Sequence, residues 1–204
     1  MADILYTYKN QVYANITNLC DCRCEFCIRS HEDGVGDAET LWHKKDPSLE
    51  EIIAAMDEFD FQGYKELVYC GYGEPTCVLE NLVKSAKYTK EKYSVLVRIN
   101  TNGLGNLYHG KDIVPILAEV ADSISISLNA PTKEEYTRVT RPNFENAFEA
   151  LLEFAGECEK MIPQVKMTVV DVLPEEEIEA SRELAESIGV ELRVRTVSYT
   201  HLTL

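Results

Sequence analysis

Six short runs of apolar, mostly β-branched residues alternate with amphipathic stretches, and this alternation limits the possible folds more than any other feature. The runs lie at Val12–Thr17, Glu66–Cys70, Val95–Asn100, Ser123–Leu128, Val165–Val172 and Glu191–Val197. Polar, glycine or proline residues bound each run, as is typical of strands. The clearest helix face between them holds Phe144, Ala147, Phe148, Leu151, Ala155 and Cys158. Strict alternation of strand and helix predicts a parallel sheet with right-handed crossovers.

The number of units sets the size of the predicted barrel. At roughly thirty residues per strand-helix unit, the chain holds about six units, two fewer than a closed eight-stranded barrel. We therefore expect an α/β fold, a partial (βα)6 TIM-like barrel with a parallel six-stranded sheet. Capping patterns support helix starts at Ser48 and Thr132, Pro174 precedes a first turn rich in glutamate, and Gly189 is a helix stop.

The chain is predicted to form one domain at residues 1–197, because no linker rich in Gly, Ser or Pro divides it. The last residues, 198–204, fit the pattern least well and resemble translated adapter sequence, so no function is assigned to them. With 204 residues and 45% hydrophobic content, the chain is long enough to bury one sizeable core.

Charge and hydropathy exclude some classes of partner. A formal net charge of −15 argues against nucleic acid, whose binding requires clustered lysine and arginine. Neither a signal-peptide pattern nor a run of eighteen apolar residues is present, so we expect no membrane association and a cytoplasmic protein.

The cysteines indicate metal chemistry. Four of the seven lie between residues 20 and 27, which suits metal ligation better than a disulfide framework. Cys20, Cys24 and Cys27 have the spacing C-x3-C-x2-C, which allows one loop to hold three corners of a [4Fe–4S] cluster. Three protein ligands leave one iron open, and an open iron can chelate the amine and carboxylate of a small molecule.

Cys22 leaves a second interpretation open, because with it the loop offers four thiols. Four thiols could close a zinc or iron–sulfur site without a vacancy, although the tight C-x-C-x-C geometry would be strained. The chain would then be a non-catalytic metal or electron-transfer module. We favour the three-ligand cluster, with Cys22 as a bystander.

Polar residues follow the second and third predicted strands. Gly71, Tyr72, Gly73 and Glu74 precede a proline, so the glycines can let the backbone approach a ligand and Glu74 can accept hydrogen bonds from an ammonium group. A simple Gly–Pro turn is the alternative. Asn100 and Asn102 suit ribose hydroxyls or a carboxylate, but Asn102–Gly103 also reads as an ordinary turn.

Further candidates come from the later strands and the loops. Ser125, Ser127 and Asn129 alternate with apolar residues and should share a face that lines a cavity. Arg195 either faces solvent or holds a carboxylate at the open edge of the barrel. We expect the other cysteines to be small buried residues and the loop histidines to be solvated: Cys70, Cys77, Cys158, His31, His43 and His109.

The pattern C-x3-C-x-aromatic-C, with Phe26 as the aromatic residue, resembles the signature of the radical S-adenosylmethionine (radical SAM) superfamily. The resemblance covers nearly the whole chain. Several segments are similar to the smaller TatD-associated group: Asn15-Ile-Thr-Asn, Cys27-Ile-Arg, Gly71-Tyr-Gly-Glu-Pro and Ser125-Ile-Ser-Leu-Asn-Ala.

This resemblance implies an enzyme that binds a [4Fe–4S] cluster and cleaves S-adenosylmethionine reductively to a 5′-deoxyadenosyl radical. It implies an electron donor such as flavodoxin or ferredoxin, and a small-molecule or protein substrate. It also implies a bare catalytic core, since no cysteine-rich C-terminal extension for auxiliary clusters follows. The implied cofactor contacts are Phe26, Gly71, Tyr72, Gly73, Glu74, Asn100, Asn102, Ser127, Asn129 and Arg195.

Overall fold

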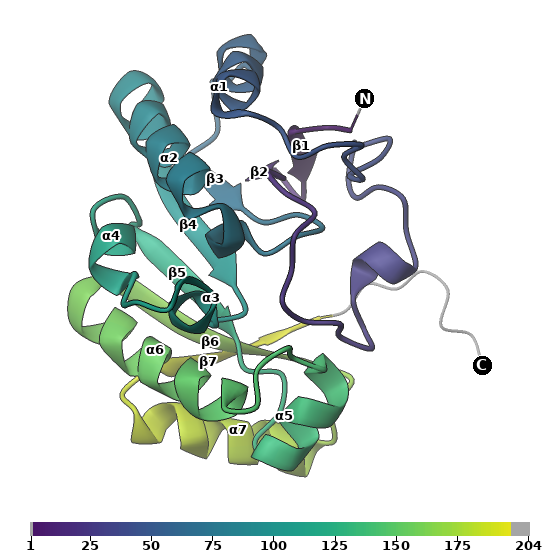
Figure 1. Ribbon diagram of the computed structural model, residues 1–204, viewed down its shortest axis with the longest axis vertical. Coiled ribbons are helices and arrows are strands. Elements are labelled where there is room, and N and C mark those ends of the chain that lie inside the picture. The colour runs from purple at the N-terminus through teal and green to yellow at the C-terminus, as the bar shows by residue number, and fades with distance from the viewer. Residues whose placement is uncertain (1, 197–204) are drawn as a thin grey trace.

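The fold is an open, curved sheet with helices on its outer side, seen in a computed structural model that describes residues 2–196 (Figure 1). The strands follow one another across the sheet in chain order. All of them from β2 to β7 run parallel, as expected for a partial α/β barrel. Their bounds are β1 Leu5–Tyr8, β2 Gln11–Ala14, β3 Glu66–Tyr69, β4 Leu96–Thr101, β5 Ser123–Ser127, β6 Gln164–Val170 and β7 Glu191–Arg195.

All six predicted strands are present, but the sheet has a seventh strand that the sequence patterns did not predict. β1 pairs antiparallel with β2, with Tyr8 opposite Gln11. The two residues between them, Lys9 and Asn10, both have positive φ (47° and 63°), as a type I′ hairpin turn requires. The predicted tail at 198–204 lies outside the described residues.

Helices connect the parallel strands and cover one face of the sheet. Figure 1 shows α1, α2, α4, α6 and α7 following one another around the outer side. No helix among the described residues is both long and apolar enough to cross a membrane. The bounds are α1 Leu49–Glu58, α2 Leu79–Tyr93, α3 Gly105–His109, α4 Val114–Ala118, α5 Lys133–Thr140, α6 Ala147–Met161 and α7 Glu175–Ser187, with short 3-10 turns at η1 Ile28–Ser30 and η2 Pro75–Val78.

The helix ends confirm the capping patterns. Ser48 and Glu51 form a complete capping box at α1. Thr132 accepts a hydrogen bond from the Glu135 amide at the start of α5. α7 begins directly after Pro174 with three glutamates in its first turn, where the helix dipole favours negative charge. Gly189 follows its last turn with a φ of +82°.

The two faces of the sheet differ in polarity. Ile99, Ile124 and Ile126 are fully or almost fully buried in the core under the helices. The residues that alternate with them, such as Asn100, Ser125 and Ser127, point to the opposite face and are only partly buried. The inner face of the open barrel is therefore polar. Since β2 to β5 run parallel, the loops that follow them meet at one end of the sheet.

Two glycines with positive φ differ in the space around them, so substituting each one distinguishes the cost of backbone strain from the cost of steric crowding. At Gly103 (φ +79°) an added Cβ would lie 2.5 Å from Leu151 Cδ1 and 3.0 Å from Ile126 Cγ2, whereas at Gly63 (φ +88°) it would meet nothing within 4 Å. We expect Gly63→Ala to lower the free energy of unfolding by about 1 kcal/mol through backbone strain alone. Gly103→Ala should cost about 2 kcal/mol more, because the core must also move. Urea denaturation tests this, and equal losses would contradict the crowding.

Candidate functional site

The cysteine loop leaves the carboxyl end of β2 and contacts α5 and the segments that follow β3 and β4. Cys20, Cys24 and Cys27 are half-buried, and Cys22 is buried. Among residues 2–196, no three His, Cys, Asp or Glu side chains are arranged to hold a metal ion.

The loop is held by the C-terminal end of α5. The amides of Arg23 and Glu25 donate to the carbonyl oxygens of Thr140 and Val139, both at 2.9 Å, and the Asn143 amide donates to the Asp21 carbonyl at 2.9 Å. Alternate residues of the loop are thus attached through their backbone groups to the last turn of α5 and to the segment that follows it.

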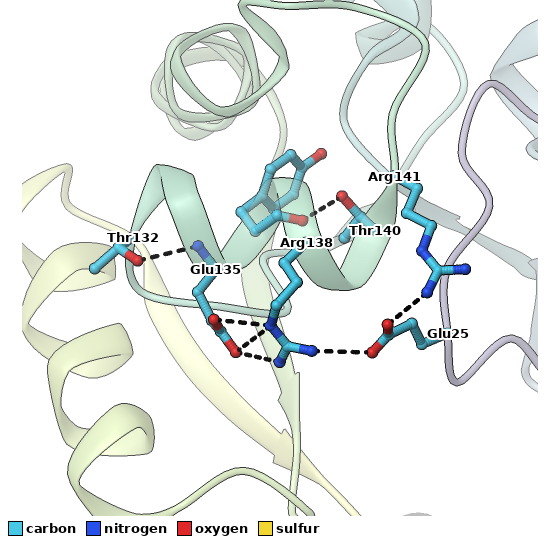
Figure 2. Close-up of polar contacts among 7 residues, drawn as sticks. Glu25, Thr132, Glu135, Arg138, Thr140 and Arg141 are labelled. Carbon is cyan, nitrogen blue, oxygen red and sulfur yellow. Dashed lines mark hydrogen bonds and ion pairs between the residues drawn. The ribbon is translucent and has the colours of Figure 1, made fainter.

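An ion-pair cluster reinforces this contact on the surface (Figure 2). Glu25 lies between Arg138, at 3.2 Å, and Arg141, at 2.6 Å. Arg138 also contacts Glu135, one turn earlier in α5. Both arginine side chains are 58% exposed, so solvent screens these ion pairs and weakens them. The backbone hydrogen bonds are therefore the main attachment, and the ion pairs orient Glu25.

The environment of the thiols sets which of them gives up its proton readily. Burial, with help from the nearby Glu74, raises the pKa of Cys20 to about 12, and burial also raises the pKa of Cys27. A hydrogen bond between Cys22 and Cys24 lowers the pKa of Cys24 and raises that of Cys22. Cys24 is thus the thiol that most favours the thiolate.

Arg29 is a residue whose role the sequence patterns did not predict. Its guanidinium donates to the carbonyl oxygens of Asn18 at 3.4 Å, Tyr72 at 3.3 Å and Cys22 at 3.5 Å. It therefore ties the loop to the segment after β3. Its positive charge also opposes the rise in the pKa of Cys20 and Cys27.

Gly71 and Gly73 pack against the start of the cysteine loop. A Cβ on Gly71 would lie 2.1 Å from Asn15 Oδ1, and one on Gly73 would lie 2.3 Å from the Thr17 carbonyl oxygen. Asn15 in turn accepts a hydrogen bond from the Tyr72 amide at 3.1 Å. Protein contacts alone therefore require glycine at both positions, and approach of a ligand to them stays a prediction.

Glu74 is buried where the two loops meet. Its amide donates to the Leu19 carbonyl at 2.7 Å. Its Oε1 accepts from the Thr76 amide and the hydroxyls of Thr76 and Thr101, and its Oε2 accepts from the Asn102 amide at 2.7 Å. These donors favour the carboxylate, but burial outweighs them and raises the pKa of Glu74 to about 7. Oε2 has room for one more donor.

The aromatic candidates lie at the edges of the loop. Tyr72 is buried, donates from its hydroxyl to the Glu32 carbonyl and meets Trp42 edge-on at 5.2 Å between ring centroids. Its side chain thus anchors the segment after the cysteines. Phe26 is partly buried against the main core.

The asparagine after β4 holds the cysteine loop. The side-chain amide of Asn102 donates to the Asp21 carboxylate and, at 3.5 Å, to Cys22 Sγ, while its Oδ1 accepts from the Leu104 amide at 3.0 Å. These protein contacts already engage the side chain, and its contact with a cofactor stays a prediction.

Two other candidate residues, Asn100 and Asn129, have side-chain oxygens without hydrogen-bond partners among residues 2–196. Asn100 Oδ1 and Asn129 Oδ1 are both buried without a hydrogen-bond partner within the described part of the chain. Asn129 adopts a left-handed conformation (φ 65°), so it turns out of β5 and does not continue the alternation of Ser127. Ser127 lies opposite Thr168 on the inner face. Buried polar atoms normally have partners, so a polar ligand would suit these two oxygens.

Arg195 ends β7 on the same face as Cys70. Burial raises the pKa of the Cys70 thiol, while a hydrogen bond from Asn100 and the charges of Arg195 and Arg98 oppose this rise. Arg195 thus acts on the interior of the barrel although its side chain is exposed. Cys77 and Cys158 are buried, as expected, whereas Cys70 is only half-buried.

Two histidines serve the fold and are not merely solvated. His43 Nε2 lies 2.9 Å from both the Asn15 carbonyl oxygen and its side-chain nitrogen. His109 Nε2 lies 2.7 Å from the Thr76 carbonyl oxygen. Asp46 also holds the loop, through the Asn18 amide at 2.9 Å and the Thr17 hydroxyl. Single loop residues carry no pattern that would have predicted these contacts.

Glu74 should make stability depend on pH. The folded state keeps a proton on Glu74 that the unfolded chain loses above about pH 4.5, so its contribution to stability falls as pH rises to about 7 and is then constant. Glu74→Gln removes this titration. We expect the free energy of unfolding of the wild type, measured relative to that of the variant, to fall by about 3 kcal/mol between pH 4.5 and 8.

Urea denaturation across this pH range measures the effect. Glu80→Gln is the control, because Glu80 is exposed and its pKa is lowered by Lys84. A pH-independent difference for Glu74→Gln would show that burial does not hold the proton.

Comparison with known proteins identifies the family. The family model described as "Radical SAM superfamily" matches residues 14–186. The comparison with curated proteins finds no match. Solved structures match the fold at low sequence identity, and the chain spans about half the length of these proteins or less.

Three of these structures illustrate the likeness. Methylornithine synthase (PylB) has a TM-score of 0.64 at 12% identity, over 90% of this chain and 52% of that one. SuiB of Streptococcus suis, bound to S-adenosylmethionine, has a TM-score of 0.63 at 16% identity, over 94% and 39%. The protein described as anSMEcpe, with bound AdoMet, has a TM-score of 0.60 at 15% identity, over 90% and 50%. The match of the family model from β2 to α7, on a fold shared with these structures, shows that the chain belongs to the radical SAM superfamily.

Proposed function

We propose that this chain is a radical SAM enzyme that holds a [4Fe–4S] cluster on Cys20, Cys24 and Cys27 and cleaves S-adenosylmethionine reductively. The observation that carries the proposal is the placement of these three thiols at the carboxyl end of β2, within the residues that the family model matches. We also propose that it belongs to the TatD-associated group, on the segments quoted from the sequence.

The residues present fit a cluster with a polar ligand beside it. Three thiols near the cationic Arg29 have the donor chemistry of an iron–sulfur site, since thiolates are the ligands and a positive charge favours them. The unpartnered oxygens of Asn100 and Asn129 are buried acceptors at the same end of the sheet. These acceptors suit the donors of S-adenosylmethionine, its ammonium group and its ribose hydroxyls.

The cluster, when bound, supplies one electron to the sulfonium of S-adenosylmethionine, which yields methionine and a 5′-deoxyadenosyl radical that removes a substrate hydrogen. The protein binds and orients S-adenosylmethionine and shields the reaction from water. Glu74 can accept from the methionine ammonium through the remaining site on Oε2, with Gly71, Tyr72 and Gly73 beside it. Phe26, Asn100, Asn102, Ser127, Asn129 and Arg195 are the proposed contacts to the rest of the cofactor.

The partners follow from the same chemistry. The enzyme would take its electron from a donor such as flavodoxin or ferredoxin and act in the cytoplasm on a small molecule or a protein. A net charge of −15 makes nucleic acid a poor substrate. Three of the chain's arginines, Arg98, Arg193 and Arg195, occur on the inner-face positions of β4 and β7, where a substrate could be bound.

Cofactor cleavage tests the proposal directly. We expect the anaerobically reconstituted and dithionite-reduced protein to form 5′-deoxyadenosine from S-adenosylmethionine and to show a cluster EPR spectrum that changes when S-adenosylmethionine is added. Cys24→Ala should abolish product formation, whereas Cys158→Ala, on the buried face of α6, should retain it. A bound zinc ion, or a cluster whose spectrum ignores S-adenosylmethionine, would favour the non-catalytic metal or electron-transfer module.

Asn129 should matter for binding more than for stability. Its Oδ1 has no partner to lose among the described residues, and its left-handed backbone suits glycine. We expect Asn129→Gly to change the free energy of unfolding by less than about 1 kcal/mol and to weaken S-adenosylmethionine binding at least fivefold. Ser94→Gly, at another left-handed position, is the control for the backbone change. Unchanged binding would exclude Asn129 as a contact.

A further inference from the structure

Arg98 is a cation on the inner face of the barrel for which the proposed function names no ligand. It lies on β4 between the fully buried residues Val97 and Ile99, so its side chain points to the polar face of the sheet. That side chain is only 16% exposed. Because arginine keeps its charge at any pH at which proteins fold, the interior of the barrel holds a permanent positive charge.

A network of neighbouring side chains holds the guanidinium of Arg98. Its Nη2 donates to Gln11 Oε1 at 3.1 Å and lies 3.2 Å from Glu66 Oε2. Gln11 also donates to Glu66 Oε2 at 3.3 Å and accepts from the Tyr13 hydroxyl at 3.0 Å. These contacts restrain the guanidinium before any ligand arrives, which lowers the entropic cost of binding one.

The network leaves one nitrogen of the guanidinium unsatisfied. Arg98 Nε is buried and has no hydrogen-bond partner within residues 2–196. A buried N–H of a charged group is costly without an acceptor, because it has lost its contact with water and gained nothing in exchange. An anion suits this position best, since a carboxylate or phosphate can accept from two N–H groups of one arginine.

The charge of the inner face favours the same kind of ligand. Four cations and two acids occupy inner-face positions of the parallel strands. They are Glu66 on β3, Arg98 on β4, Lys166 on β6, and Glu191, Arg193 and Arg195 on β7. Each acid is paired with a cation of the same face, Glu66 with Arg98 and Glu191 with Lys166. These positions are thus net positive in a chain of net charge −15, and a cleft of one sign attracts ligands of the other.

The place of Arg98 along its strand limits the size of the ligand. Asn100, a proposed contact to S-adenosylmethionine, lies two residues further along the same face of β4, which is roughly 7 Å. An anionic group bound at Arg98 therefore lies beside the proposed cofactor contacts. This suits a small substrate whose reacting carbon is only a few bonds from its anionic group.

Resting on the proposed function, we propose that the substrate is a small molecule with a carboxylate or phosphate group and that Arg98 binds this group inside the barrel. Gln11 and Glu66 orient the guanidinium, and its Nε supplies a donor that no protein acceptor uses within the described chain. Arg98 binds the substrate and takes no part in the transfer of hydrogen.

Nuclear magnetic resonance of arginine-labelled protein tests the site without the cluster. The Nε–H signal that Arg98→Lys removes should shift to saturation with added inorganic phosphate or acetate, but not with sodium chloride at equal ionic strength. Arg182 on α7 is the internal control, because its Nε already donates to Glu179 at 3.4 Å. Tighter binding of phosphate would identify a phosphate ester as the substrate class, and tighter binding of acetate a carboxylic acid.

Two variants separate anion binding from folding, with calorimetric titration of inorganic phosphate as the measurement. Arg98→Gln should weaken binding about tenfold or more, and the control Arg182→Gln should leave it unchanged. Glu66→Gln removes the negative charge beside Arg98 and should strengthen binding, which a purely structural ion pair does not predict. If Arg98→Gln does not fold, the result for Glu66→Gln decides.

Three results would overturn the inference. They are an Arg98 signal that no anion shifts, binding that does not strengthen in Glu66→Gln, and loss of phosphate binding when the reconstituted protein is saturated with S-adenosylmethionine. The last result would assign Arg98 to the cofactor. Formation of 5′-deoxyadenosine without anion binding would refute this inference alone. Anion binding by a protein that forms no 5′-deoxyadenosine would refute the proposed function, and the role of the anion as a substrate with it.

Discussion

The carboxylate of Glu74 joins three segments that are far apart in the sequence. Its backbone bonds to the start of the cysteine loop, and its side chain bonds to η2 and to the residues that end β4. Burying a carboxylate is costly unless donors surround it, and here four donors do so. One ionisable group thus joins the loops after β2, β3 and β4 at the carboxyl end of the sheet. The hydrogen bonds that join these loops also offset part of the cost of burying the group.

Patterns of short range predicted most of the fold. β-branched runs located the six parallel strands, helical spacing located α6, and a capping box located the start of α1. The number of units led to an open barrel, because six strands cannot close the sheet. The sequence patterns missed β1 for two reasons. Lys9 is an uncommon residue type in a left-handed conformation, and tyrosines on both strands hide the apolar alternation.

The sequence predicted where the candidate residues lie in the fold, but not which groups they contact. The cysteines, Gly71–Glu74, Asn100 and Asn129 all lie at the expected end of the sheet. Sequence patterns could not predict which groups contact one another. Gly71 and Gly73 pack against Asn15 and Thr17, and Asn102 donates to Asp21. The end of α5 holds the loop through Val139 and Thr140. These contacts join residues up to 122 positions apart, as for Asp21 and Asn143, and no local periodicity encodes them.

The attachment of the cysteine loop to α5 gives the spacing of its cysteines a meaning that ligand chemistry alone does not. Backbone groups of residues 21, 23 and 25 bond to Asn143, Thr140 and Val139. Inserting or deleting one residue between Asp21 and Glu25 would move at least one of these backbone groups away from its partner, whatever side chains the loop carries. Length is therefore constrained more tightly here than residue type, most clearly at Arg23, which contributes through its backbone.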